Sequence, residues 1–130
     1  MDTVSFDDFK KLDIGIGTVV KAEVPEWSHW VMKMTVDLGD PPASGGKKVC
    51  FSGIMKFFKP EEFIGKQYPF LINLEPKKIG PNKELSEAMM LMACPGEDDP
   101  ASLKLRGASE ETAPVLFELQ EKVPNGTKVF

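Results

Sequence analysis

Hydrophobic and polar residues alternate most regularly between residues 31 and 38. The apolar positions are Met32, Met34, Val36 and Leu38. Lys33, Thr35 and Asp37 fall between them. Because successive side chains of a strand point to opposite faces, this period of two predicts a β-strand with one buried face and one solvated face.

Four more segments have the apolar composition of strands. They cover residues 14–24, 49–52, 68–74 and 85–93. Gly15 and Gly17 alternate with isoleucines in the first, and glycines inside a strand indicate a sharp bend or a close backbone approach. Pro69 lacks a backbone N–H, so we expect it at the start of its strand or at a sheet edge. A turn at 124–127 precedes a last short strand, 128–130.

A short helix is predicted near the N-terminus, over residues 6–12. Ser5 can cap it, and Asp8, three residues further on, completes a carboxylate variant of the capping box. Phe6 and Phe9 are three residues apart and share one face of this helix. That apolar face should therefore dock on another surface.

Residues 54–64, with Pro60 able to begin a helical turn, indicate a helical connection between the third and fourth strands. Many short strands without repeats or a βαβ rhythm favour a small barrel. The predicted fold is all-β with a small α content: a five-stranded OB-type barrel with an N-terminal helix, whose second helix lies between strands three and four. Residues 1–130 form one domain, and 95–114 is an inserted, exposed loop.

Charge is unevenly distributed. The net charge of −4 argues against a strongly basic nucleic-acid-binding protein. From Lys47 to Lys83, however, the chain has eight lysines and three acids, whereas 97–121 is acidic. Clustered lysine can attract phosphate in a protein of negative net charge, and it can equally form a solvated surface.

The sequence does not indicate a secreted, membrane-spanning, disulfide-rich or metal-dependent protein. The acidic N-terminus lacks a signal peptide, and no apolar run approaches the roughly 18 residues of a membrane span. Cys50 and Cys94 are too few for a disulfide framework, so we expect a cytoplasmic protein with reduced thiols. His29 is the only histidine. No metal site, cofactor, phosphate-binding glycine loop or catalytic constellation is predicted, so we do not expect an enzyme.

Short motifs along the chain resemble one known family. Residues 6–14 and 17–23 are similar to the opening of CsaA-type proteins, of the tRNA-binding domain appended to methionyl-tRNA synthetases, and of endothelial monocyte-activating polypeptide. Further similar blocks follow in the same order at 36–39, 52–54, 59–62 with 65–66, 73–78, 86–89 and 123–128. Each block is short, but their number and order make the resemblance specific.

This resemblance implies an OB fold, usually homodimeric, that binds the outer shape of tRNA. In the CsaA branch it also implies a chaperone that binds unfolded or exported polypeptides. We expect a free-standing chain, and its Ser86-Glu87 follows the pattern of that branch, so the resemblance is nearer to CsaA. It departs from the family at Gly15, where an arginine is common. Residues 27–30, Trp-Ser-His-Trp, replace the Asn-Ala-Asp-Lys step of the tRNA-binding branch.

Seven residues form the predicted RNA- or peptide-binding face. An exposed tryptophan can stack a base or grip an apolar side chain, lysines attract phosphate, serines offer hydroxyls, and methionine suits an adaptable apolar pocket. Of the two tryptophans, the one at the mouth of the second strand is the better candidate for exposure, and the paired lysines should lie in the loop between strands four and five. The residues are Trp30, Ser52, Lys56, Lys77, Lys78, Ser86 and Met89.

Three functions remain open on this basis. The first is a non-catalytic protein that binds tRNA or another structured RNA. The second is a CsaA-type chaperone in which Trp30 and Met89 form an apolar pocket edged by lysine. The third is a dimerisation module without a ligand. For the first two, the expected partners are tRNA or unfolded polypeptide, together with a second copy of the chain.

Overall fold

The computed structural model describes residues 2–39, 46–96 and 113–130. Most of the predicted 95–114 loop lies outside these ranges. No helix in the described residues is long and apolar enough to span a bilayer. The elements are α1 (Phe6–Lys10), β1 (Ile14–Glu23), β2 (Met32–Asp37), β3 (Lys47–Ser52), the 3-10 turn η1 (Pro60–Glu62), β4 (Gln67–Leu71), β5 (Lys77–Ile79), β6 (Glu84–Ser86), β7 (Met89–Met90), β8 (Met92–Ala93) and β9 (Val115–Leu116).

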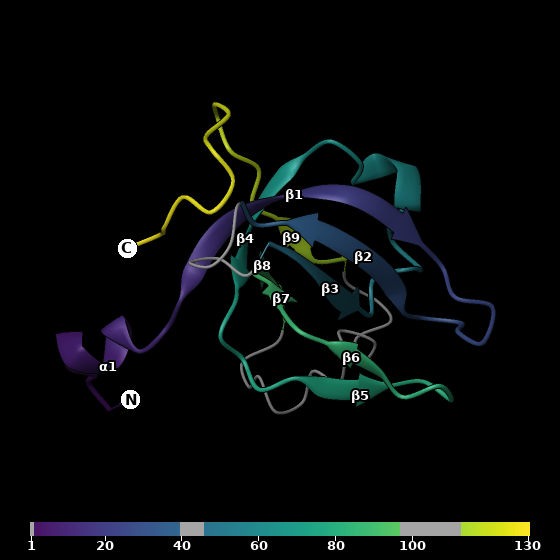
Figure 1. Cartoon of the computed structure of the whole chain (residues 1–130), viewed down its shortest axis with the longest axis horizontal. Helices are drawn as coiled ribbons and strands as arrows, with labels where there is room; N and C mark the ends of the chain where they lie inside the picture. The colour runs from purple at the N-terminus through teal and green to yellow at the C-terminus, as the bar shows by residue number, and fades with distance from the viewer. Residues whose placement is uncertain (1, 40–45, 97–112) are drawn as a thin grey trace.

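Five strands form an antiparallel sheet in the order β3-β2-β1-β4-β7 (Figure 1). The sheet curls until β3 returns to the segment that follows β6. There the Glu87 N–H donates to the Val49 carbonyl at 2.8 Å, and the Met90 backbone hydrogen-bonds the Cys50 thiol. The result is a nearly closed five-stranded barrel, which confirms the predicted OB-type fold. The β5–β6 hairpin lies outside this sheet.

The alternation seen in β2 holds in the structure. Met32, Met34 and Val36 are fully buried in the barrel core, while the residues between them are only half-buried. Burial of each such side chain stabilises the fold by roughly 1.5–3 kcal/mol. Around them the core contains Val19, Leu38, Cys50, Ile54, Phe63, Tyr68, Phe70, Ile72 and Met90.

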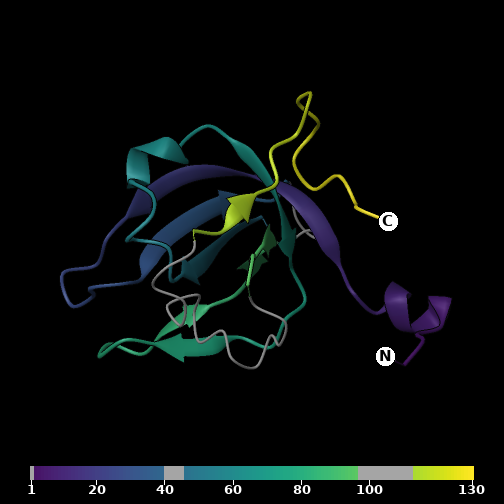
Figure 2. The same ribbon diagram turned by 180° about the vertical axis from the view of Figure 1, so that it is seen from behind.

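β1 is the strand that bends across the barrel (Figure 2). Residues 14–18 pair with β4, and residues 18–23 pair with β2, with a bulge between Val19 and Lys21. The predicted close approach at the glycines is confirmed. A Cβ on Gly17 would lie 2.5 Å from Val36 Cγ1 and 3.2 Å from the Asp37 carbonyl oxygen. One on Gly15 would meet the movable Cδ1 of Ile72 at 2.6 Å.

The predicted helical connection over 54–64 is not confirmed. Only Pro60–Glu62 is helical, as one 3-10 turn, and 55–57 form a separate turn. Pro60 explains the interruption, because the ring disfavours the helical conformation in the residue before it. Lys59 is accordingly extended, with φ −96° and ψ 148°.

The fourth and fifth predicted strands are shorter than expected. β4 ends at Leu71 rather than 74, and residues 85–93 divide among β6, β7 and β8. Pro69 lies in the middle of β4, not at its start, but faces the point where β7 stops. Its carbonyl accepts from the Leu91 N–H at 3.0 Å, and it has no N–H to return, so the β4–β7 ladder cannot continue there.

The two termini lie on the same side of the barrel (Figures 1 and 2). The predicted capping box is present at α1, where the Asp8 N–H donates to the Ser5 hydroxyl. The predicted turn at 124–127 is closed by the Thr127 N–H on Pro124. The predicted last strand is reduced to one bridge, between Lys128 and Gly15.

We expect Gly17→Ala to destabilise the protein by about 1–3 kcal/mol, because the added methyl group meets a core valine and a backbone carbonyl that cannot move apart. Gly15→Ala is the matched control and should cost less, since only a side-chain end must shift. Urea unfolding of both variants measures the difference. Equal costs would contradict the proposed close approach at Gly17.

Stability should fall at alkaline pH. Burial raises the pKa of the Cys50 thiol from 9.0 to about 11. Burial, helped by Glu118 and Glu62, raises that of Tyr68 from 10.0 to about 12. Both groups stay neutral to a higher pH in the folded chain than in the unfolded chain. Their contribution to the free energy of unfolding is therefore full below pH 9.0 and declines as the pH rises toward 12. Urea unfolding across this range should show a smaller decline in Cys50→Ala, and an unchanged one in Cys94→Ala.

Candidate nucleic-acid interface

Trp30 is held on a fixed backbone while its ring remains exposed. The buried Ser28 hydroxyl accepts from the N–H groups of Trp30, at 3.2 Å, and Val31, at 2.7 Å. The Trp30 carbonyl accepts from the Met55 N–H at 3.2 Å. The side chain is nevertheless 42% exposed. An aromatic ring on so constrained a backbone is prepared to stack on a ligand with little loss of conformational freedom.

Trp27 has a different role. Its ring lies 6.3 Å from that of Phe51, centroid to centroid. It also packs against a second cluster of buried residues outside the barrel, formed by Val31, Phe51 and Ile79. Trp27 therefore ties the β1–β2 loop to the outer face of β3. The prediction that Trp30 is the more exposed tryptophan is confirmed.

The β5–β6 hairpin is attached to the same outer face by polar contacts. The Ser86 hydroxyl accepts from the Phe51 N–H at 3.1 Å. The Lys33 ammonium lies 2.7 Å from a Glu84 carboxylate oxygen, with both side chains largely shielded from solvent. The Ser86 hydroxyl is thus used in a hydrogen bond within the protein, where it attaches the hairpin to β3.

Lys77 and Lys78 were expected in a loop, but both lie in β5. Lys77 pairs with Ser86 and Lys78 with Leu85 across the hairpin. Because neighbours in a strand point to opposite faces, Lys77 shares the face of buried Ile79, and Lys78 shares the outer face with Leu85. The two lysines therefore present their charge in different directions.

The remaining predicted residues are divided between two parts of the surface. Ser52 is the ladder partner of Met32 and is 7% exposed. Lys56 is exposed in the turn that bonds to Trp30. These residues, with Lys77 and Ser86, surround one end of the β2–β3 ladder. Met89 is 43% exposed on β7, opposite Leu71, and belongs to the β4–β7 side of the barrel.

Ion pairs distinguish the lysines. Lys33 is neutralised by Glu84, Lys66 by Glu118 at 3.6 Å and Lys128 by Asp13 at 2.6 Å. Three hairpin lysines make no ion pair within the part of the chain that the structure describes: Lys77, Lys78 and Lys83. Their charge is available to an anionic ligand.

The hairpin was missed from the sequence, although a signal existed. Gly80-Pro81-Asn82-Lys83 has the composition of a turn, and it separates two short runs that each contain an apolar residue. The runs are only three residues long, too short for an alternation to be recognised. As a result, Lys83 was not singled out as a site residue.

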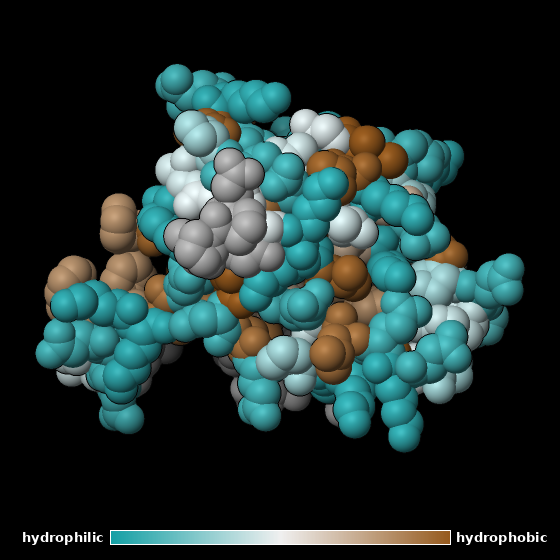
Figure 3. Space-filling model, in the orientation of Figure 1, coloured by the Kyte–Doolittle hydropathy of each residue, from teal (hydrophilic) through white to brown (hydrophobic). Residues whose placement is uncertain are grey.

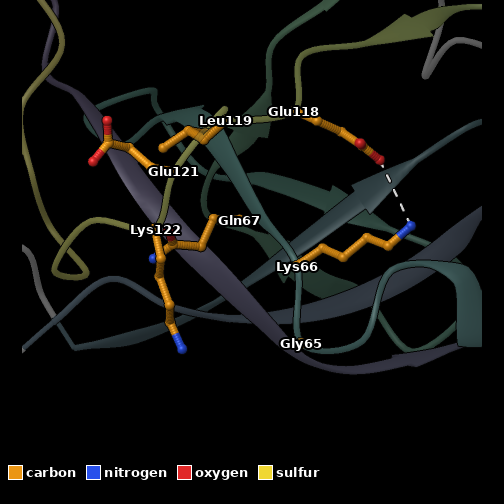
Figure 4. A pocket seen from close by; sticks show the side chains of 7 residues that line it. All are labelled: Gly65, Lys66, Gln67, Glu118, Leu119, Glu121 and Lys122. Carbon is orange, nitrogen blue, oxygen red and sulfur yellow. Dashed lines mark ion pairs between the residues drawn. The ribbon is translucent and has the colours of Figure 1, made fainter.

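A pocket of about 240 Å³ lies elsewhere, between β4 and the C-terminal segment (Figure 4). Gln67 in its wall is fully engaged: its amide nitrogen donates to the Val123 carbonyl at 2.7 Å, and its oxygen accepts from the Val123 N–H at 3.0 Å. In the described ranges, no three His, Cys, Asp or Glu side chains are placed to hold a metal ion. The pocket is lined by Gly65, Lys66, Gln67, Glu118, Leu119, Glu121 and Lys122, and includes none of the predicted site residues.

Comparison with known proteins identifies the family. The family described as "Putative tRNA binding domain" matches residues 14–128, which run from β1 to the C-terminal bridge. The chain belongs to this family. A methionine–tRNA ligase of Porphyromonas gingivalis is 37% identical over 113 residues, which cover 87% of this chain and 15% of the ligase. The chain thus spans about one-seventh of the length of such relatives.

Solved structures of the same size extend the match. A MetRS-related protein from Pyrococcus horikoshii is 28% identical, with a TM-score of 0.78 and complete coverage of both chains. A chaperone CsaA from Bacillus anthracis is also 28% identical, with a TM-score of 0.75, covering 99% of this chain and all of the other. The resemblance of the sequence to this family is therefore confirmed along the whole barrel.

Proposed function

We propose that this chain is a non-catalytic, cytoplasmic tRNA-binding protein that recognises the outer shape of tRNA through one face of its barrel. The observation that carries the proposal is the exposed Trp30 ring on a backbone fixed by Ser28 and Met55. The family match supports it, and so do the hairpin lysines, which form no ion pair with any residue that the structure describes. The proposed face contains Trp30, Lys56 and Lys77, with Ser52 and Ser86 beneath it, while Lys78 points to the other face of β5.

The chemistry of this face suits an RNA backbone with an accessible base. Stacking of one base on an aromatic side chain contributes roughly 1–3 kcal/mol and tolerates any base. Lysines add attraction that depends on salt and not on sequence. A protein that reads shape needs both of these and few contacts to base edges.

A CsaA-type chaperone is the second candidate. The observation that favours it is the exposure of three apolar residues: Trp30 is 42% exposed, Leu85 on the hairpin 46%, and Met89 on the β4–β7 side 43%. Together with the structural similarity to a chaperone CsaA, this surface suits an unfolded polypeptide. Met89 would then contribute adaptable apolar contact.

A salt titration separates the two candidates. We expect tRNA affinity to fall steeply from low to moderate salt as counterions are released, whereas apolar peptide binding should change little.

Trp30→Ala should weaken tRNA binding by about 1–3 kcal/mol. Phe117→Ala removes an aromatic residue that is 47% exposed on the segment after β9, and is the matched control. Absence of tRNA binding by the natural chain at low salt would refute the first candidate.

We also propose that the chain is a homodimer. α1 has only five residues and buries none of them, and so short a helix is not stable in isolation. Val4 is 74% exposed, Phe6 71% and Leu12 49%. α1 lies away from the barrel on the side of the C-terminus, and hydrophobic residues are exposed there (Figures 1 and 3). A second copy would cover this surface.

Sedimentation at micromolar concentration tests the dimer. The natural chain should show twice its 14.4 kDa mass. Phe6→Asp should yield monomers, because a carboxylate at a buried interface is costly. Ile64→Asp alters a residue that is 51% exposed after η1 and should remain dimeric. A monomeric natural chain would contradict the proposal.

A further inference from the structure

The β1–β2 loop and the β5–β6 turn are locked together. The Trp27 ring lies against Gly80 so closely that a Cβ there would come within 2.5 Å of Cζ2. Gly80 has φ +76°, a conformation that glycine alone adopts readily. Both loops project from the same side of the barrel (Figures 1 and 2). We call residues 25–31 and 80–83 the rim.

Lys83 closes the turn in an unfavourable conformation. Its N–H donates to the Gly80 carbonyl at 3.1 Å. Its φ of +53° makes it the one non-glycine residue with positive φ in the described ranges. Glycine and asparagine are the residues that a turn normally places there, and Asn82 is one position away. A lysine in this conformation points to a use for its charge.

We propose that Lys83 binds a phosphate of the same RNA whose base stacks on Trp30, so that the rim contacts that RNA at two points. This inference rests on the proposed tRNA-binding function. Gly80 is fixed by Trp27, and Lys83 is fixed to Gly80, so its backbone is held relative to the loop that carries Trp30. Lys83 is exposed and makes no ion pair with any described residue. A ring and a cation on two loops that pack together match RNA, which offers bases that stack and a charged phosphate backbone.

Titration of unfractionated tRNA against salt tests the proposal. Lys83→Gln should weaken binding at low salt and lower the slope of log affinity against log salt by about one. Lys83→Arg should keep both, because the charge is retained. Lys122→Gln, an exposed lysine of the C-terminal segment, is the matched control and should leave both unchanged.

Lys83→Gly separates a binding role of Lys83 from a purely structural one, because the two roles predict different changes in stability and tRNA binding. Glycine relieves the left-handed strain, so the thermal unfolding midpoint should rise while tRNA binding weakens. If Lys83→Gln and Lys83→Gly both bind tRNA as the natural chain does, the Lys83 contact is refuted and the tRNA-binding function stands. If the natural chain itself binds no tRNA at low salt, the proposed function fails instead.

Discussion

The bend of β1 is the constraint on which the structure depends. One strand must pair with β4 through residues 14–18 and with β2 through residues 18–23, which is possible only if the backbones approach closely where it turns. Gly17 allows this, because no Cβ separates it from Val36 and the Asp37 carbonyl. Without the bend the sheet would stay open, and β3 could not return to Glu87 and Met90.

Closure of the barrel creates a second apolar cluster on its outside. The outer face of β3 carries Phe51, whose ladder partner is the lysine of the Lys33–Glu84 pair. Trp27 covers it from the β1–β2 loop, and Ile79 covers it from β5. This small cluster attaches the hairpin and the β1–β2 loop to the barrel, and so determines which polar side chains remain at the surface. The proposed interface is arranged by this packing.

The electrostatics of the surface follow from the same arrangement. Two lysines are neutralised by acids distant in sequence, in the pairs Lys66–Glu118 and Lys33–Glu84. The hairpin lysines have no such partner among the described residues. A chain of net charge −4 can therefore present a local positive surface, which is what a salt-dependent RNA contact requires.

The sequence by itself determined the strands whose side-chain period is long enough to detect and the capped N-terminal helix, because these depend on neighbours in the chain. A glycine inside a strand also indicated the close approach at Gly17, although the residues that it meets are distant in sequence. The sequence also indicated that Trp30 would be exposed. Only the tertiary structure decided that Lys77 and Lys78 face opposite ways, that the Ser86 hydroxyl accepts from the Phe51 N–H, and that Gly80, in the turn that Lys83 closes, packs against Trp27. These features depend on which distant segments meet when the barrel closes. A three-residue strand carries too little periodicity to reveal its partner.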